Sequence, residues 1–129
     1  MIPAFSVSGL PRIVFGEGAL RQAPILSASF GRRVLLVSGG RSLRDSAHWG
    51  ALTAGLRAQG LYWEEMRIHG EPSPRIVDEA VRAWRGAHIE VVIGIGGGSV
   101  LDAAKAVAGL LPHGNSVLDH LEGAGPELP

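Results

Sequence analysis

Residues 91–108 read VVIGIGGGSVLDAAKAVA. The apolar run Val91 to Ile95 predicts a strand that is covered on both faces of a sheet. The three glycines that follow carry no Cβ atoms, so a ligand can approach the backbone N–H groups closely. Ser99 is expected to cap the next helix, with Asp102 completing a variant of the capping box, and its hydroxyl is also expected to donate to a phosphate. Unpaired N–H groups and a positive dipole end would then face the loop, which is typical of a pyrophosphate site formed by Gly96, Gly97 and Gly98.

A second pair of glycines marks another turn. The run Val34 to Val37 predicts a buried strand, and Gly39 and Gly40 follow it after one residue. Ligands of parallel α/β sheets bind at the carboxyl ends of the strands, so we expect this turn to lie at the same edge as the triple-glycine loop. Gly39 and Gly40 are therefore predicted to lie close to a ribose or phosphate of a bound dinucleotide.

The residues after this second turn bear on the choice of cofactor. NAD sites usually offer a carboxylate to the ribose hydroxyls, whereas NADP sites admit a 2′-phosphate with small or basic groups. Here Arg41 and Ser42 follow the glycine pair, and no acidic residue comes before Asp45. The turn thus predicts NADP in preference to NAD, with Arg41 and Ser42 as part of the site. A solvated surface role for Arg41 and a helix-capping role for Ser42 stay open as alternatives.

Strands and helices are expected to alternate along the chain. Phe5 to Val7 and Arg12 to Phe15 predict a short hairpin at an edge of the sheet. Apolar periodicity predicts helices over Ala19 to Ala28, around Leu52 and Leu56 up to Gly60, and over Ser73 to Arg85, and a third core strand over Leu61 to Ile68. This order predicts an α/β, Rossmann-like fold in which a mostly parallel sheet carries helices on both faces. Residues 1–129 would form a single dinucleotide-binding domain.

The composition excludes several classes of function. The formal net charge is zero and the eleven Arg and one Lys are spread along the chain, so no face for nucleic acid is expected. The absence of cysteine excludes disulfides and thiol chemistry. Val91 to Leu111 is a poor membrane span, since Asp102 and Lys105 near its middle would each cost about 2.5 to 3.5 kcal/mol. The amino-terminal residues do not resemble a signal peptide, and a cytoplasmic location is the default expectation.

The string Gly-Gly-Gly-Ser-x-x-Asp-x-x-Lys, from Gly96 to Lys105, closely resembles the signature of the iron-containing (group III, metal-dependent) alcohol dehydrogenase family. Shorter matches follow in the family's order at Pro11 to Leu20, Arg33 to Ser38, Pro72 to Pro74 and Ser116 to Gly123. The resemblance implies NAD(P)-dependent hydride transfer between the nicotinamide and an alcohol or carbonyl carbon, with an iron-type divalent ion as Lewis acid. It also implies contact between Asp102 and the nicotinamide riboside, which competes with a capping role.

Members of this family are considerably longer. The resemblance implies a Thr-rich stretch downstream and a helical domain that supplies an Asp and three His to the metal, so no catalytic or metal-binding residue is expected in this chain. The alcohol substrate would bind through that missing domain. A dinucleotide- or phosphate-binding module without catalysis, an interaction domain with a vestigial loop, and relatives such as glycerol dehydrogenase or maleylacetate reductase stay open as alternatives. Val117 to Leu121 and the Pro-rich tail Gly125 to Pro129 resemble an interrupted connection, so exposed apolar surface at that edge and a tendency to associate, for example as a homo-oligomer, are expected.

Overall fold

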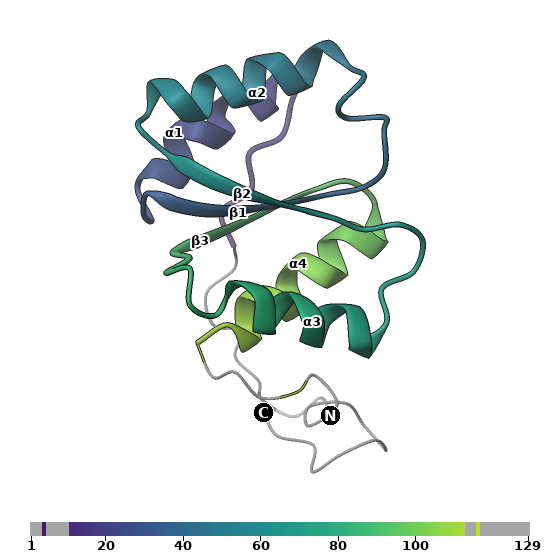
Figure 1. The fold of residues 1–129 in the computed structure, drawn as a ribbon. Coiled ribbons are helices and arrows are strands. Elements are labelled where there is room, and N and C mark those ends of the chain that lie inside the picture. Colours follow the sequence, from purple (N-terminus) through teal and green to yellow (C-terminus); the bar gives the residue numbers. More distant parts are fainter. Residues whose placement is uncertain (1–3, 5–10, 113–115, 117–129) are drawn as a thin grey trace.

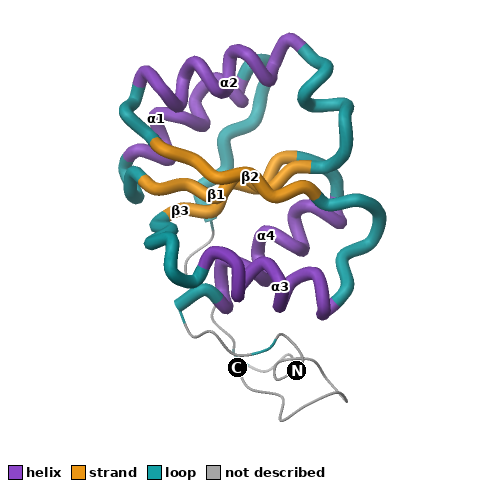
Figure 2. Tube along the Cα trace, viewed as in Figure 1, coloured by secondary structure: helices purple, strands orange, loops and turns teal. Residues whose placement is uncertain are grey.

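The structure, a computed structural model, describes residues 4, 11–112 and 116 of the chain. Among these residues, three parallel strands form one sheet in the order β2-β1-β3, with β1 at Arg33–Ser38, β2 at Tyr62–Arg67 and β3 at Val91–Ile95. The helices are α1 at Ala23–Ala28, α2 at Ala47–Ala58, α3 at Pro74–Trp84 and α4 at Gly98–Leu110, and a 3-10 helix, η1, spans Ala19–Gln22. Figures 1 and 2 show α1 and α2 on one face of the sheet and α3 and α4 on the other. The predicted α/β fold, a parallel sheet between two helical layers, is confirmed.

The sheet is built around β1, whose four apolar side chains from Val34 to Val37 are fully buried at 0% exposure. Because side chains alternate along a strand, Val34 and Leu36 face one helical layer while Leu35 and Val37 face the other. The first pair forms a core cluster with α2, and the second forms a larger cluster with α3 and α4. The predicted core positions of α2 and α3 pack into these clusters, namely Leu52, Leu56, Ile76, Val77, Ala80, Val81 and Trp84.

The two outer strands are less buried than their sequences predict. β2 was expected to be a core strand, but it pairs only with β1, and its first residue Tyr62 is 75% exposed. Leu61, Met66 and Ile68 are the buried apolar residues in and beside this strand. β3 was expected to be covered on both faces, yet all five of its residues are only partly buried. Both predictions are wrong in degree, because each strand lies at an edge of the described sheet and has one strand neighbour instead of two.

The chain before the first strand departs from prediction. The first arm of the expected hairpin, Phe5 to Val7, lies outside the described residues. The second arm, Arg12 to Phe15, is irregular chain instead of a strand, with Ile13 81% and Phe15 98% exposed, so this part of the prediction is wrong. No strand in the described part of the chain pairs with it, and an unpaired segment of this length does not form a strand by itself.

The helix expected over Ala19 to Ala28 consists of two parts. Its first turn is the 3-10 helix η1, and the α-helix α1 begins at Ala23. Pro24 lies in the first turn of α1. Proline has no backbone N–H and cannot donate to a carbonyl in the preceding turn, so regular α-helix begins only beside it. The prediction of helix in this region is confirmed, but not as one continuous α-helix.

Gly60 ends α2, as the sequence predicts. Its φ of +70° is in the left-handed region, which glycine enters without a Cβ penalty. The Gly60 N–H donates to the Arg57 carbonyl at 2.9 Å, and the Leu61 N–H donates to the Leu56 carbonyl at 3.0 Å. This pair of bonds is the Schellman motif, and it turns the chain from α2 directly into β2.

Replacing Ser73 by alanine is expected to lower the free energy of unfolding by about 1 kcal/mol. Ser73 is the N-cap residue of α3, and its Oγ accepts a hydrogen bond from the Ile76 N–H at 3.2 Å. Urea denaturation measures the change. Ser73→Asp keeps an acceptor oxygen at the cap and should retain most of the stability. Equal losses in the two variants would contradict a capping role for this side chain.

Candidate nucleotide-binding site

The two glycine turns leave the sheet as neighbours. β1 and β3 pair in parallel with Ser38 opposite Ile95, so Gly39 and Gly96 are the next residues along adjacent strands. A Cβ on Gly39 would lie 3.6 Å from Cγ2 of Val100, and a Cβ on Gly96 would lie 2.7 Å from the same atom. The Val100 side chain, in the first turn of α4, therefore lies against both turns. The fold brings the two predicted turns together at the carboxyl ends of the strands, where ligands of such sheets bind.

The three consecutive glycines are not equivalent. A Cβ on Gly96 would lie 2.7 and 2.9 Å from Cγ2 and Cβ of Val100, closer than real Cβ contacts come. Packing against Val100 thus requires glycine at position 96. At Gly97 and Gly98, in contrast, an added Cβ would meet no heavy atom within 4 Å, and both residues are exposed. A side chain at either position would project into solvent above the backbone. Glycine leaves this space open to a ligand that contacts the backbone N–H groups.

A further glycine of this region was missed by the sequence analysis. A Cβ on Gly94, in the middle of β3, would lie 2.7 Å from Cβ of Ala104 on α4. The close approach of strand and helix depends on this glycine and this alanine together. Glycine inside an apolar strand commonly marks such an approach, so the signal was present in the sequence.

Helix α4 begins earlier than predicted. Its N-cap residue is Gly97, and the Leu101 N–H donates to the Gly97 carbonyl at 3.1 Å. The predicted capping role of Ser99 is wrong, because Ser99 lies inside the first turn and the N-cap residue, Gly97, has no side chain that could cap the helix. The predicted capping box with Asp102 is wrong for the same reason, and Asp102 is exposed on the second turn. The first N–H groups of a helix have no partner within it, so the amino end of α4 is available to an anion.

The hydroxyl of Ser99 has a different partner. It donates a hydrogen bond to Oε1 of Glu71, at 3.2 Å, across 28 positions of sequence. Glu71 lies in the loop between β2 and α3, which leaves the sheet beside β1, where the Ile68 N–H donates to the Ser38 carbonyl at 2.8 Å. Glu71 could not be predicted from the sequence, because nothing in the local pattern relates it to the glycine loop.

The turn after β1 presents Arg41 and Ser42 to solvent. The turn is closed by the Asp45 N–H, which donates to the Arg41 carbonyl at 2.9 Å. The alternative in which Ser42 caps the next helix is wrong, because the N-cap residue of α2 is Ser46. An added Cβ at Gly40 would meet no heavy atom within 4 Å. Gly40, Arg41 and Ser42 thus form an open surface next to Gly39.

A polar cluster holds this turn on the sheet. Arg44 forms an ion pair with Glu65 of β2, and its guanidinium lies 4.7 Å from the ring centroid of Trp49 on α2. The indole N–H of Trp63 also donates to Glu65, at 3.2 Å. Both tryptophans thus make polar contacts in addition to packing. Arg44 and Glu65 are 21 positions apart in the sequence, so sequence spacing gave no indication of the cluster.

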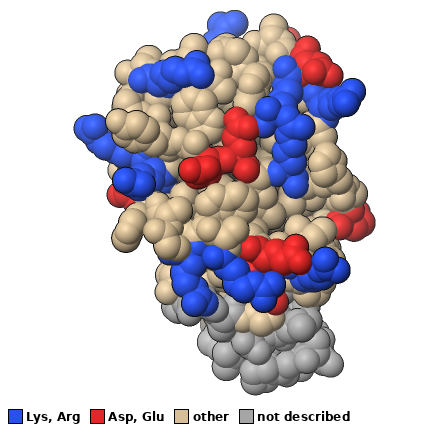
Figure 3. All heavy atoms as spheres, in the orientation of Figure 1, with Lys and Arg blue, Asp and Glu red and all other residues tan. Residues whose placement is uncertain are grey.

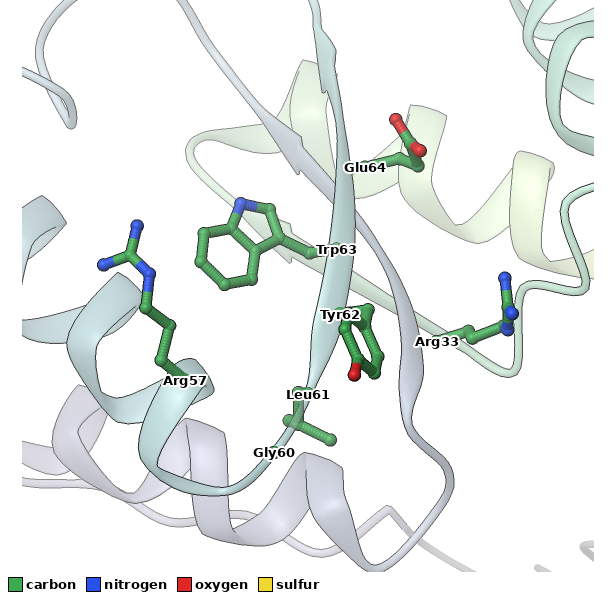
Figure 4. A pocket seen from close by; sticks show the side chains of 7 residues that line it. All are labelled: Arg33, Arg57, Gly60, Leu61, Tyr62, Trp63 and Glu64. Carbon is green, nitrogen blue, oxygen red and sulfur yellow. The ribbon is translucent and has the colours of Figure 1, made fainter.

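A surface hollow lies elsewhere on the described part of the chain. Its volume is about 660 Å³, and it surrounds the beginning of β2, with Arg33, Arg57, Gly60, Leu61, Tyr62, Trp63 and Glu64 as its lining. Figure 4 shows Trp63 on the same side of β2 as Arg57, whose guanidinium lies 5.1 Å from the indole centroid. Arg33 and Tyr62 are the first residues of their strands. The hollow is therefore at the amino ends of the strands, opposite the glycine turns.

The described residues were also compared with the requirements of a charged binding face, a metal site and a membrane span. Figure 3 shows basic and acidic side chains interspersed on the face in view. Within residues 11–112, no group of three or more His, Asp or Glu side chains is placed to hold a metal ion. The helices in this part of the chain are all too short or too polar to cross a membrane. The segment Val117 to Leu121, from which association is predicted, lies outside the described residues.

Comparison with known proteins gives a consistent result. A family model described as "Iron-containing alcohol dehydrogenase" matches residues 11–129. A probable NADH-dependent butanol dehydrogenase of Bacillus subtilis is 33% identical over 99 residues, which are 75% of this chain and 25% of that protein. An NADPH-dependent butanol dehydrogenase of Clostridium saccharobutylicum is 32% identical over 117 residues, covering 88% of this chain and 29% of that protein. The crystal structure of NADH-dependent butanol dehydrogenase A from Thermotoga maritima is similar with a TM-score of 0.83 and 30% identity, over 98% of this chain and 31% of that one.

These matches agree with the geometry in two respects. They cover both glycine turns, and the similar crystal structure shares the arrangement of sheet and helices over nearly the whole chain. The chain spans about a quarter to a third of the length of the relatives it matches. The family model covers far more than half of the sequence, and this chain therefore belongs to the iron-containing alcohol dehydrogenase family.

Proposed function

We propose that this chain is the dinucleotide-binding domain of an NAD(P)-dependent, metal-dependent alcohol dehydrogenase. One observation carries the proposal. At Gly97 and Gly98 the backbone is exposed, an added Cβ would meet only open space, and the uncapped amino end of α4 begins at these residues. The arrangement suits a pyrophosphate, because backbone N–H groups and the helix dipole both stabilise negative charge there.

Different residues around this site would contact different parts of the bound cofactor. The N–H groups of the turn from Gly96 to Gly98 would bind the pyrophosphate together with Ser99, and Asp102 on the exposed second turn would face the nicotinamide riboside. Gly39 and Gly40 would pass beneath the adenosine ribose. When bound, the nicotinamide supplies the carbon that donates or accepts the hydride. The contribution of this chain is to hold the cofactor in one orientation, which removes much of the entropic barrier to transfer.

We further propose that NADP is preferred to NAD. Arg41 and Ser42 are exposed beside Gly40, and the sequence from Ser38 to Ser42 carries no carboxylate that would repel a 2′-phosphate. A guanidinium and a hydroxyl are suitable donors to that phosphate. The relatives named above include one described as NADPH-dependent and two described as NADH-dependent, so the family itself allows either cofactor.

The remaining parts of the reaction would come from outside residues 1–129. The resemblance to the family implies that an iron-type ion and the alcohol or carbonyl substrate would bind to another part of the protein. There the ion would polarise the substrate oxygen as a Lewis acid. A homo-oligomer and a cytoplasmic location stay predictions from the sequence.

Calorimetric titration of the chain with NADPH and with NADH tests the proposal. We expect saturable binding of both nucleotides, tighter for NADPH. In the full-length protein loaded with Fe²⁺, we expect oxidation of a primary alcohol to reduce the same nucleotide. Absence of binding by either nucleotide at millimolar concentration would contradict the proposed function. Tighter binding of NADH would contradict only the preference for NADP.

A further inference from the structure

A carboxylate lies at the entrance to the proposed pyrophosphate site. Glu71 is exposed, and its Oε1 accepts the hydrogen bond from the Ser99 hydroxyl at 3.2 Å. Ser99 is the second residue of α4, directly after the open positions Gly97 and Gly98. Neither of the two ion pairs among the described residues involves Glu71, so no cation there neutralises its charge.

This position is favourable for a negative charge. The first-turn N–H groups of α4 have no partner within the helix, and the dipole makes this end positive. The N-cap residue Gly97 has no side chain, and among the described residues the Glu71 carboxylate is the acidic group bound to the first turn of α4. In this arrangement the Ser99 proton points to Glu71 and is not available to a phosphate oxygen.

We propose that Glu71 is an internal competitor for the phosphate site. In the nucleotide-free chain it takes the place of an anion at the amino end of α4 and engages the Ser99 hydroxyl. Binding of a pyrophosphate brings two further negative charges to the same place, so the carboxylate must withdraw and release Ser99. Glu71 thereby weakens binding of the dinucleotide and favours its release. The inference rests on the proposed function, since it concerns the same site.

Titration of the Glu71→Gln variant tests this inference. The probes are inorganic pyrophosphate without a divalent cation, NADH and NADPH, each at low and at high salt. Removing the charge should tighten binding of all three probes about threefold to tenfold at low salt, because like charges a few ångströms apart in water repel to about this extent. The gain should shrink at high salt, since ions screen exposed charges.

Glu64→Gln is the matched control. Glu64 is exposed on the edge strand β2, away from the glycine turns. Its replacement by glutamine changes the net charge by the same amount as Glu71→Gln. Its affinities should equal those of the parent chain. Ser99→Ala removes the hydroxyl that anchors the carboxylate, so the gain from Glu71→Gln should be smaller in the double variant than in the parent background. Glu71 and Glu64 are exposed and Ser99 is half-buried, and urea denaturation verifies that each variant folds.

The outcomes separate the inference from the function on which it rests. If the parent binds the three probes and Glu71→Gln binds them equally or more weakly, the inference is wrong and the nucleotide site stands. A gain of the same size from Glu64→Gln would also overturn it, because net charge alone would then explain the effect. If the parent binds none of the probes, the proposed function fails and the inference fails with it.

Discussion

Gly97→Val is expected to weaken binding of NADPH and NADH by about 100-fold or more, the loss of about two charge-assisted hydrogen bonds. A valine side chain at this position would occupy the open space in which the pyrophosphate should lie on the backbone. The fold should tolerate it, because an added Cβ meets no heavy atom within 4 Å and the backbone, at φ −79° and ψ −169°, is in the extended region. Calorimetric titration measures the affinities.

The same substitution one residue earlier is the control. Gly96→Val places a Cβ 2.7 Å from Cγ2 of Val100, inside the core contact between α4 and the sheet. It should lower the free energy of unfolding by about 1 to 3 kcal/mol or more, whereas Gly97→Val should cost only about 1 kcal/mol through the less favourable N-cap residue. If a folded Gly97→Val chain retained its nucleotide affinity, the assignment of the pyrophosphate site to the turn from Gly96 to Gly98 would be wrong.

Gly40→Asp is expected to weaken NADPH binding by about 100-fold and to leave NADH binding unchanged or improved. The new carboxylate would repel the 2′-phosphate and would be able to accept hydrogen bonds from the ribose hydroxyls of NADH. Space is available, since an added Cβ at Gly40 meets no heavy atom within 4 Å. Paired titrations with the two nucleotides give the change in their affinity ratio.

A matched control separates a local effect from a change in net charge. Gly86 lies exposed between α3 and the amino end of β3, and a Cβ there would also meet no heavy atom within 4 Å. Gly86→Asp adds the same carboxylate at the end of the sheet opposite the glycine turns, so it should leave the affinity ratio as it is in the parent. An unchanged ratio in Gly40→Asp, or equal shifts in both variants, would show that this turn does not face the 2′-phosphate.

Much of this architecture follows from patterns that are local in the sequence. The apolar run of β1, the glycine that ends α2 and the proline-containing start of α3 each depend on neighbours within one or two turns of chain. Such signals predicted the type and order of the elements, apart from the amino-terminal hairpin. These signals did not predict the burial of β2 and β3. Whether Tyr62 or Ile95 has a second neighbouring strand depends on the arrangement of the whole sheet.

The candidate site divides in the same way. The sequence by itself determined that a triple glycine follows a strand and opens a helix, that a second glycine pair follows another strand, and that the signature from Gly96 to Lys105 resembles one enzyme family. These properties are covalent order and local conformational preference, which a chain carries before it folds. Family membership, which the comparisons confirm, could therefore be predicted from the sequence alone.

Only the tertiary structure decided which positions face a ligand. It distinguished Gly96, where a side chain would clash with Val100, from Gly97 and Gly98, where a side chain would contact no protein atom. It also gave Ser99 a partner 28 residues away in the chain, where a capping role had been expected. The physical reason is that open space and carboxylate contacts depend on atoms from separate elements, and their distances exist only after the sheet and helices have packed together.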